Sequence, residues 1–187
     1  MLSIILPAVD LVKANEMVQD IEAQFNNVQI IVSSNRQSLG KGWAVREALK
    51  QATGDFVCFL DGDGDIAPRM IKRLIPYLQD YDIVLGCKPI SGLWSRRFLT
   101  YWSRLYIALM FGVKVSTQTG IKIFKRHAIT EWYNDGYLFE LEIIALAKQN
   151  GSTMIEVPIE AEVNKRMKFI SIWKALKESI TLWLELK

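Results

Sequence analysis

Three aspartates at alternate positions, Asp61, Asp63 and Asp65, are the residues whose types and spacing most directly indicate chemistry. Carboxylates this close repel one another unless a cation lies between them, and hard oxygen ligands favour a divalent metal. A solvated acidic turn is the competing interpretation, because Asp and Gly are common in turns. A helix-loop-helix calcium loop is excluded, since its sixth and twelfth positions would hold Ile66 and Lys72 instead of Gly and Glu.

The aspartates directly follow an apolar run at residues 56–60. This run is short and is bounded by Gly54 and Asp55, so we expect a buried strand. The carboxylates would then lie at the carboxyl end of a strand, where open α/β sheets bind their ligands.

The elements around this strand predict an α/β fold with a mostly parallel central sheet flanked by helices. Earlier strands are expected at residues 2–7, where Pro7 ends the strand, and at 28–32, with helices at 10–25 and 44–51. Later elements are expected as helices at 68–78 and 139–149, strands at 81–86 and 154–159, a turn and a strand over 118–125, and a helix from about 169 to the end. No linker or repeat divides the chain, so residues 1–187 are interpreted as a single domain.

Composition excludes some classes of protein. The net charge of +3 is too small to indicate nucleic-acid binding, and two cysteines in 187 residues suggest a reducing compartment. We expect no signal peptide, because no charged region precedes the first apolar run, and no window is apolar enough for a membrane span. The oligomeric state stays open, with a homo-oligomer among the alternatives.

A second motif, Gly40-Lys41-Gly42, precedes a predicted helix. It is not a nucleoside-triphosphatase phosphate loop, which requires Ser or Thr after the lysine. The lysine and the helix amides could still approach an anion. A helix start with a solvent-exposed lysine is the simpler interpretation of this motif alone.

Taken together and in order, the motifs resemble the nucleotide-sugar domain of family-2 glycosyltransferases of the GT-A type, and most of all polyprenyl- and dolichyl-phosphate mannose or glucose synthases. The resemblance covers roughly residues 2–170. The matching segments are Gly40-Lys41-Gly42-x-Ala44, Ala52-x-Gly54-Asp55, Asp61-Gly62-Asp63, Gly86-Cys87-Lys88, Thr117-Gln118-Thr119-Gly120-Ile121-Lys122-Ile123-Phe124, Phe139-Glu140-Leu141-Glu142 and Glu156-Val157-Pro158.

The resemblance implies a metal-dependent, inverting transfer of a hexose from a nucleoside-diphosphate sugar to a polyprenyl phosphate. Asp61, Asp63 and Asp65 would hold Mg²⁺ or Mn²⁺ against the diphosphate. The implied donor-binding residues are Pro7, Ser33, Ser34, Lys41, Asp61, Gly62 and Lys88. The implied catalytic residues are Asp63, Glu140 and Arg166, and the candidates for the acceptor phosphate are Arg97, Arg104 and Lys168.

The sequence departs from the family pattern at three places. Pro7-Ala8-Val9-Asp10 stands where the family has Pro-x-Tyr-Asn-Glu, and Ser33-Ser34 stands where it has paired aspartates. Ser116 replaces an aspartate before the Thr-Gln motif. The first two changes affect the region expected to recognise the base. These departures make a nucleotide-sugar-binding module without turnover one alternative function. The other alternative is a glycosyltransferase with a soluble or glycan acceptor, in which the aromatic helices are merely structural.

The C-terminal segment, about 165–187, has the pattern of an amphipathic helix with basic residues beside tryptophans. Such a helix suits a membrane surface rich in anionic lipid, and residues 93–111 are expected to provide a second contact. The alternative is that both helices pack on the protein's own sheet or on another protomer. With a lipid acceptor, the expected location is cytoplasmic and peripherally associated with the membrane.

Overall fold

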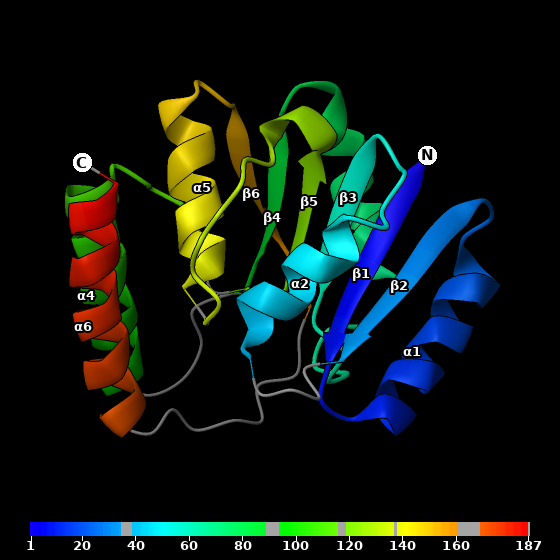
Figure 1. The fold of residues 1–187 in the computed structure, drawn as a ribbon, viewed down its shortest axis with the longest axis horizontal. Helices are drawn as coiled ribbons and strands as arrows, with labels where there is room; N and C mark the ends of the chain where they lie inside the picture. The colour runs from blue at the N-terminus through cyan, green and yellow to red at the C-terminus, as the bar shows by residue number, and fades with distance from the viewer. Residues whose placement is uncertain (35–38, 89–93, 116–118, 137, 161–168, 187) are drawn as a thin grey trace.

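The computed structural model describes residues 1–34, 39–88, 94–115, 119–136, 138–160 and 169–186, without the side chains of residues 95–97, 99 and 169–175. A six-stranded sheet has the order β2-β1-β3-β5-β4-β6 (Figure 1). β5 runs antiparallel to β3 and β4, and the other pairings are parallel, which confirms the predicted sheet. The strands are β1 (Leu2–Ala8), β2 (Val28–Ser34), β3 (Phe56–Leu60), β4 (Ile83–Cys87), β5 (Ile121–Lys125) and β6 (Met154–Pro158).

Helices cover both faces of the sheet. On one face α1 and α3 pack on alternate strand residues such as Ile4 and Cys58. On the other face α2 and α5 pack on the residues between them, such as Ile5 and Phe59. The helices are α1 (Leu11–Gln24), α2 (Lys41–Leu49), α3 (Met70–Leu74), α4 (Trp94–Phe111), α5 (Phe139–Gln149) and α6 (Phe169–Glu185), with the short 3₁₀ segments η1 (Ile75–Gln79) and η2 (Arg126–Ala128).

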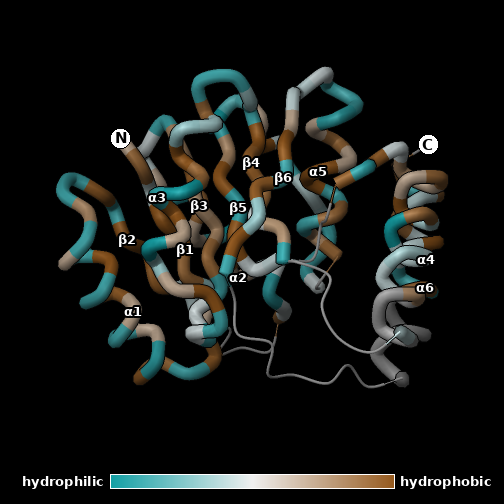
Figure 2. Tube along the Cα trace, turned by 180° about the vertical axis from the view of Figure 1, so that it is seen from behind, coloured by the Kyte–Doolittle hydropathy of each residue, from teal (hydrophilic) through white to brown (hydrophobic). Residues whose placement is uncertain are grey.

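The helices α4 and α6 lie side by side at one end of the molecule, outside α5 (Figures 1 and 2). Leu182 of α6 packs against Leu138 and Leu141 at α5. The Tyr106 hydroxyl of α4 lies 3.0 Å from Ser179 Oγ of α6. The two helices are thus fastened to the domain through one face of each.

Two prolines act differently from the prediction. Pro7 does not end β1, because the strand continues through Ala8 beside β2. The pairing of β1 with β3 stops at Ile5, so the missing N–H of Pro7 removes no bond on that side. Pro76 divides the helix expected at 68–78 into α3 and η1, because proline lacks the N–H that would continue the helical ladder.

Candidate active site

The acidic turn lies at the carboxyl end of β3, between the end of β1 and the start of β5. The Asp61 amide donates to the Gly120 carbonyl at 2.8 Å, and the Gly62 amide donates to the Pro7 carbonyl at 3.1 Å. A Cβ on Gly62 would lie 2.8 Å from Cβ of Ala8, so glycine lets the turn approach β1 closely. These contacts hold the Asp61 carboxylate at the sheet edge where ligands of α/β proteins bind.

Four charged side chains form a row that begins at this turn. Lys41 Nζ lies 2.6 Å from Asp61 Oδ1 and 2.8 Å from Glu140 Oε1. Glu140 Oε2 pairs with the ammonium of Lys122, which also donates to the Thr119 carbonyl. The exposed fraction of the side chains falls along the row, from 34% for Asp61 through 21% for Lys41 and 10% for Glu140 to 1% for Lys122. The row therefore leads from solvent into the core with alternating charge.

The row controls the ionisation of its members. Burial raises the pKa of the Asp61 carboxyl, and the nearby Lys41 ammonium offsets this only in part. Burial also disfavours the charged forms of Glu140 and Lys41. The two lysines nevertheless hold the pKa of Glu140 below its usual value, and the two carboxylates hold the pKa of Lys41 above its usual value.

The start of α2 positions Lys41. Gly40 has φ +107°, and a Cβ there would lie 2.0 Å from the Asp135 carbonyl oxygen. The Gly42 amide donates to that same carbonyl at 2.8 Å. The Lys41 ammonium lies 5.6 Å from the centroid of the buried Phe139 ring, at the start of α5. The two glycines thus bring the first turns of α2 and α5 together, with Lys41 between them.

The other two aspartates of the turn lie farther along it. Asp63 Oδ1 accepts from the Asp65 amide at 3.2 Å, and the Asp63 carbonyl lies 3.5 Å from Lys13 Nζ of α1. Within the described ranges, no group of three or more His, Cys, Asp or Glu side chains is arranged to hold a metal ion. Mg²⁺ usually binds one or two carboxylates together with substrate phosphates and water, not a cage made only of protein. The partly exposed carboxylates of Asp63 and Asp65 fit that kind of site.

Pro7, Ser33 and Ser34 are neighbours at the ends of β1 and β2. Ser33 Oγ donates to the Ala44 carbonyl of α2 at 2.6 Å, so its proton is already engaged within the protein. Ser33 can therefore only accept a hydrogen bond from a ligand.

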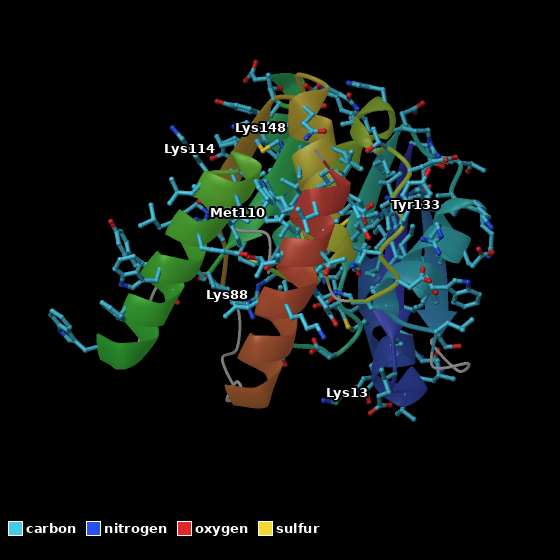
Figure 3. The ribbon with its side chains drawn as sticks, turned by 60° about the vertical axis from the view of Figure 1, so that its left-hand side comes forward. Lys13, Lys88, Met110, Lys114, Tyr133 and Lys148 are labelled. Carbon is cyan, nitrogen blue, oxygen red and sulfur yellow. The ribbon has the colours of Figure 1, made fainter. Side chains whose placement is uncertain are left out.

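Lys88 and Arg104 lie at the carboxyl end of β4. Figure 3 shows Lys88 in the lower half of the molecule, with Lys13 below it. Arg104 binds both oxygens of Glu156, with 2.7 Å between Nη2 and Oε2, and lies 3.9 Å from Cys87 Sγ. Burial disfavours its charged form, but Glu156 holds the pKa of Arg104 above its usual value. Ser116, Arg166, Lys168 and the side chain of Arg97 lie outside the described part of the chain.

Lys122 and Gly120 belong to the site but are absent from the residues predicted for it. A Cβ on Gly120 would lie 2.5 Å from Asp61 Oδ2. A lysine between isoleucines in the apolar strand at 121–124 is an available signal, because a lysine is seldom buried without a partner. That signal does not identify the partner, which comes from α5.

The sequence of this chain is similar to those of known glycosyltransferases. The model of the family "Glycosyl transferase family 2" matches residues 13–129, more than half of the chain. Dolichyl-phosphate beta-glucosyltransferase from Saccharomyces cerevisiae is 24% identical over 85% of this chain and 56% of that protein. Undecaprenyl-phosphate mannosyltransferase from Micrococcus luteus is 25% identical over 56% of this chain and 48% of that protein. The chain thus spans about half the length of these relatives.

Solved structures show the same fold. Glucosyl-3-phosphoglycerate synthase from Mycobacterium tuberculosis, in complex with uridine diphosphate, superposes with a TM-score of 0.76 at 17% identity. The match covers 99% of this chain and 79% of that chain. Because the family model matches more than half of the chain, the chain belongs to glycosyl transferase family 2.

Proposed function

We propose that this protein is a glycosyltransferase that moves a hexose from a nucleoside-diphosphate sugar to a polyprenyl phosphate at a membrane surface. The observation that carries the proposal is the pairing of Lys41 with the acidic turn at the carboxyl edge of a family-2 domain. This arrangement combines carboxylate oxygens for a metal with an ammonium group for a phosphate.

In this proposal the donor lies over the acidic turn. Asp61, Asp63 and Asp65 would hold Mg²⁺ or Mn²⁺, which would supply positive charge to neutralise the departing diphosphate. A solved structure of the mycobacterial synthase contains Mn²⁺ and uridine-diphosphate-glucose, which supports a divalent cation and a nucleoside-diphosphate sugar as ligands. Lys41 and Lys88 add positive charge near the phosphates, and Pro7, Ser33, Ser34 and Gly62 line the nucleotide side.

The reaction needs little help from a base. A phosphate monoester is largely ionised at neutral pH, with a second pKa of about 6. One of its oxygens attacks the anomeric carbon of the sugar, the bond from that carbon to the diphosphate oxygen breaks, and the configuration inverts. Asp63 contributes at the leaving diphosphate and Arg166 at the reacting phosphates. Glu140 acts through Lys41, because lysines already engage both of its oxygens.

The relatives support the lipid acceptor, since two of them are named for transfer to dolichyl or undecaprenyl phosphate. Arg97, Arg104 and Lys168 are the proposed ligands of the acceptor phosphate. For Arg104 this requires a rearrangement of its pair with Glu156.

The surface of α4 and α6 supports peripheral attachment to a membrane, and we propose that this attachment is at the cytoplasmic face. α4 exposes Trp94, Phe98, Tyr101, Trp102 and Leu109, and α6 exposes Leu176, Ile180 and Leu184. We call these residues the apolar rim. Along the parts of the chain that the structure describes, no helix has the length and apolar character needed to cross a bilayer.

A soluble phosphorylated acceptor is the second candidate. The mycobacterial synthase has been solved in complex with phosphoglyceric acid, and its fold covers nearly the whole of this chain. In this case the apolar rim would not bind a membrane. The donor site would be the same.

The first experiment identifies the donor. Thermal unfolding is followed with UDP-, GDP-, CDP- and dTDP-sugars, each with Mn²⁺, Mg²⁺ or EDTA. A donor at a hundredfold excess over its dissociation constant stabilises the protein by about 2.7 kcal/mol, or about 5 to 10 °C. We expect one base to give such a shift and EDTA to remove it.

The second experiment follows transfer from that donor to a short polyprenyl phosphate or to 3-phosphoglycerate. Transfer to the lipid, with a loss of at least about a hundredfold in Asp63→Ala, supports the proposal, since removing a key electrostatic group costs this much. Transfer only to 3-phosphoglycerate favours the second candidate. Binding without any transfer favours the nucleotide-sugar-binding module, and full activity in both Asp61→Ala and Asp63→Ala contradicts the metal assignment.

A further inference from the structure

Lys122 is the most deeply buried charged side chain of the row, with 1% of its side chain exposed. Its ammonium binds the Glu140 carboxylate and the Thr119 carbonyl. Burying a lysine is costly, so a pair of this kind is seldom justified by stability alone. Lys122, the second lysine on Glu140, therefore needs a functional explanation.

The two lysines and the two carboxylates of the row share their ion pairs. Lys41 serves two carboxylates, Asp61 at 2.6 Å and Glu140 at 2.8 Å. Glu140 in turn has a separate lysine on each oxygen, Lys41 on Oε1 and Lys122 on Oε2. Two ammonium groups therefore balance two carboxylates, and Lys41 is the more exposed of the two lysines.

A diphosphate that binds at the acidic turn competes with Glu140 for Lys41. If Lys41 moves toward the phosphate, Glu140 keeps Lys122 and is not left as an unpaired buried charge. Without Lys122, the same movement would leave the buried carboxylate alone, which is strongly unfavourable. Lys41 would then stay on Glu140 and be lost to the ligand.

We propose that Lys122 is a positioning residue that holds Glu140 and so releases Lys41 to bind the diphosphate of the donor. This inference rests on the proposed function, because it assigns the ligand of the same site. It concerns the diphosphate only and does not depend on the base, the sugar or the acceptor.

Inorganic pyrophosphate with Mg²⁺ is the probe, since it carries the diphosphate without a base. Its dissociation constant is measured by titration calorimetry for the wild type, Lys122→Met, Lys122→Arg and Lys125→Met. Lys125 lies on the same strand but pairs with Asp82, away from the row. We expect Lys122→Met to weaken binding by about tenfold or more, within the usual range of coupling between groups. Lys122→Arg keeps the charge and restores most of the affinity, and Lys125→Met binds as the wild type does.

The double variant Lys122→Met with Glu140→Gln separates this role from a purely structural one. Removing the carboxylate that competes for Lys41 should return the affinity to within about threefold of the wild type, a non-additive result. A structural role predicts that the double variant binds no better than Lys122→Met. If Lys122→Met does not fold, Glu140→Gln is compared with the double variant. Equal affinities then support the proposal, and unequal affinities overturn it.

Two other results overturn the inference: wild-type affinity in a folded Lys122→Met variant, and a wild type that does not bind pyrophosphate. A wild type that binds pyrophosphate but transfers no sugar has a different meaning. It overturns the proposed function and leaves the role of Lys122 intact.

Discussion

At the scale of single residues, the site depends on glycines, which have no side chain, as much as on its charged residues. Asp61 can stand beside β5 only because Gly120 has no Cβ, since one would lie 2.5 Å from Asp61 Oδ2. Gly42 likewise allows α2 to approach the segment before α5, because a Cβ there would lie 2.3 Å from the Asn134 carbonyl oxygen. The charged row is thus built into spaces that glycines leave open.

Gly120→Ala should therefore damage the donor site specifically. The added methyl group displaces the Asp61 carboxylate. Overpacking of this kind costs about 1–3 kcal/mol of folding stability. A loss of about the same size in transition-state stabilisation lowers kcat/KM by about 5- to 150-fold. Steady-state kinetics with the identified donor measure the loss. Gly136→Ala is the control, since its Cβ would meet only the Asn134 side-chain oxygen at 3.2 Å. Equal kinetics for the two variants would contradict the role of Gly120.

At the scale of elements, the antiparallel strand β5 assembles the site. It lies between β3 and β4, so Lys122 pairs with Phe59 of β3 on one side and with Leu85 of β4 on the other. This brings Gly120 and Lys122 next to the end of β3, while α5 supplies Glu140 from the face above. The four members of the row come from α2, the β3 turn, β5 and α5.

The opposite end of β4 has its own anchor, Asp82. Its carboxylate accepts from the Thr153 amide at 2.9 Å and the Thr153 hydroxyl at 2.8 Å, and lies 3.2 Å from Lys125 Nζ. The Thr153 hydrogen bonds, aided by Lys125, hold the pKa of Asp82 well below its usual range. The anchor ties the start of β6 and the end of β5 to the start of β4.

Because the pKa of Asp82 is lower in the folded protein than in the unfolded chain, its stabilising effect is complete above the unfolded pKa of about 4. The effect is lost as the pH falls toward the folded pKa. Asp82→Asn should therefore lower the free energy of unfolding by about 1–3 kcal/mol at pH 7. The difference from the wild type should narrow below about pH 4. Urea unfolding between pH 3 and 7 measures this, with the exposed neighbour substitution Asp80→Asn as the control. A difference that does not change with pH would rule out the ionised carboxylate as the cause.

At the scale of the whole molecule, α4 and α6 lie together at one side of the domain (Figure 2). The exposed side chains of the apolar rim belong to these two helices. α6 has a buried side and an exposed apolar side: Ser179 and Leu182 are buried, whereas Leu176, Ile180 and Leu184 are exposed. The buried side of α6 fits the expectation that the helix packs on the protein. Its exposed side presents an apolar surface, as a membrane contact would require. Trp94 of α4, 85% exposed, is among the most exposed residues of the rim.

Ile180→Glu tests the proposed membrane contact. Ile180 is half exposed on the rim, and a buried isoleucine contributes about 1.5–3 kcal/mol. Flotation with anionic liposomes should show binding weakened by about tenfold or more, with the free energy of unfolding little changed. Thr181→Glu adds the same charge at the next exposed position and should bind as the wild type does. Wild-type binding by Ile180→Glu, or no liposome binding by the wild type, would contradict the membrane contact.

The sequence by itself determined the class of the fold and the place of the acidic turn. Strand patterns depend on local alternation and on bounding turn residues, so the central strand at 56–60 was predicted with the bounds of β3. The order of family motifs along the chain indicated glycosyl transferase family 2, which the family model confirms. The roles of the metal ligands and of the acceptor residues stay predictions.

Only the tertiary structure decided which charges meet. Glu140 and Lys41 are 99 positions apart in the chain, and their contact depends on the packing of α5 against α2. The antiparallel placement of β5, which makes Lys122 the inner end of the row, comes from a long-range pairing. Local pattern contains no information about such pairings, because they are set by how whole elements bury their apolar faces together.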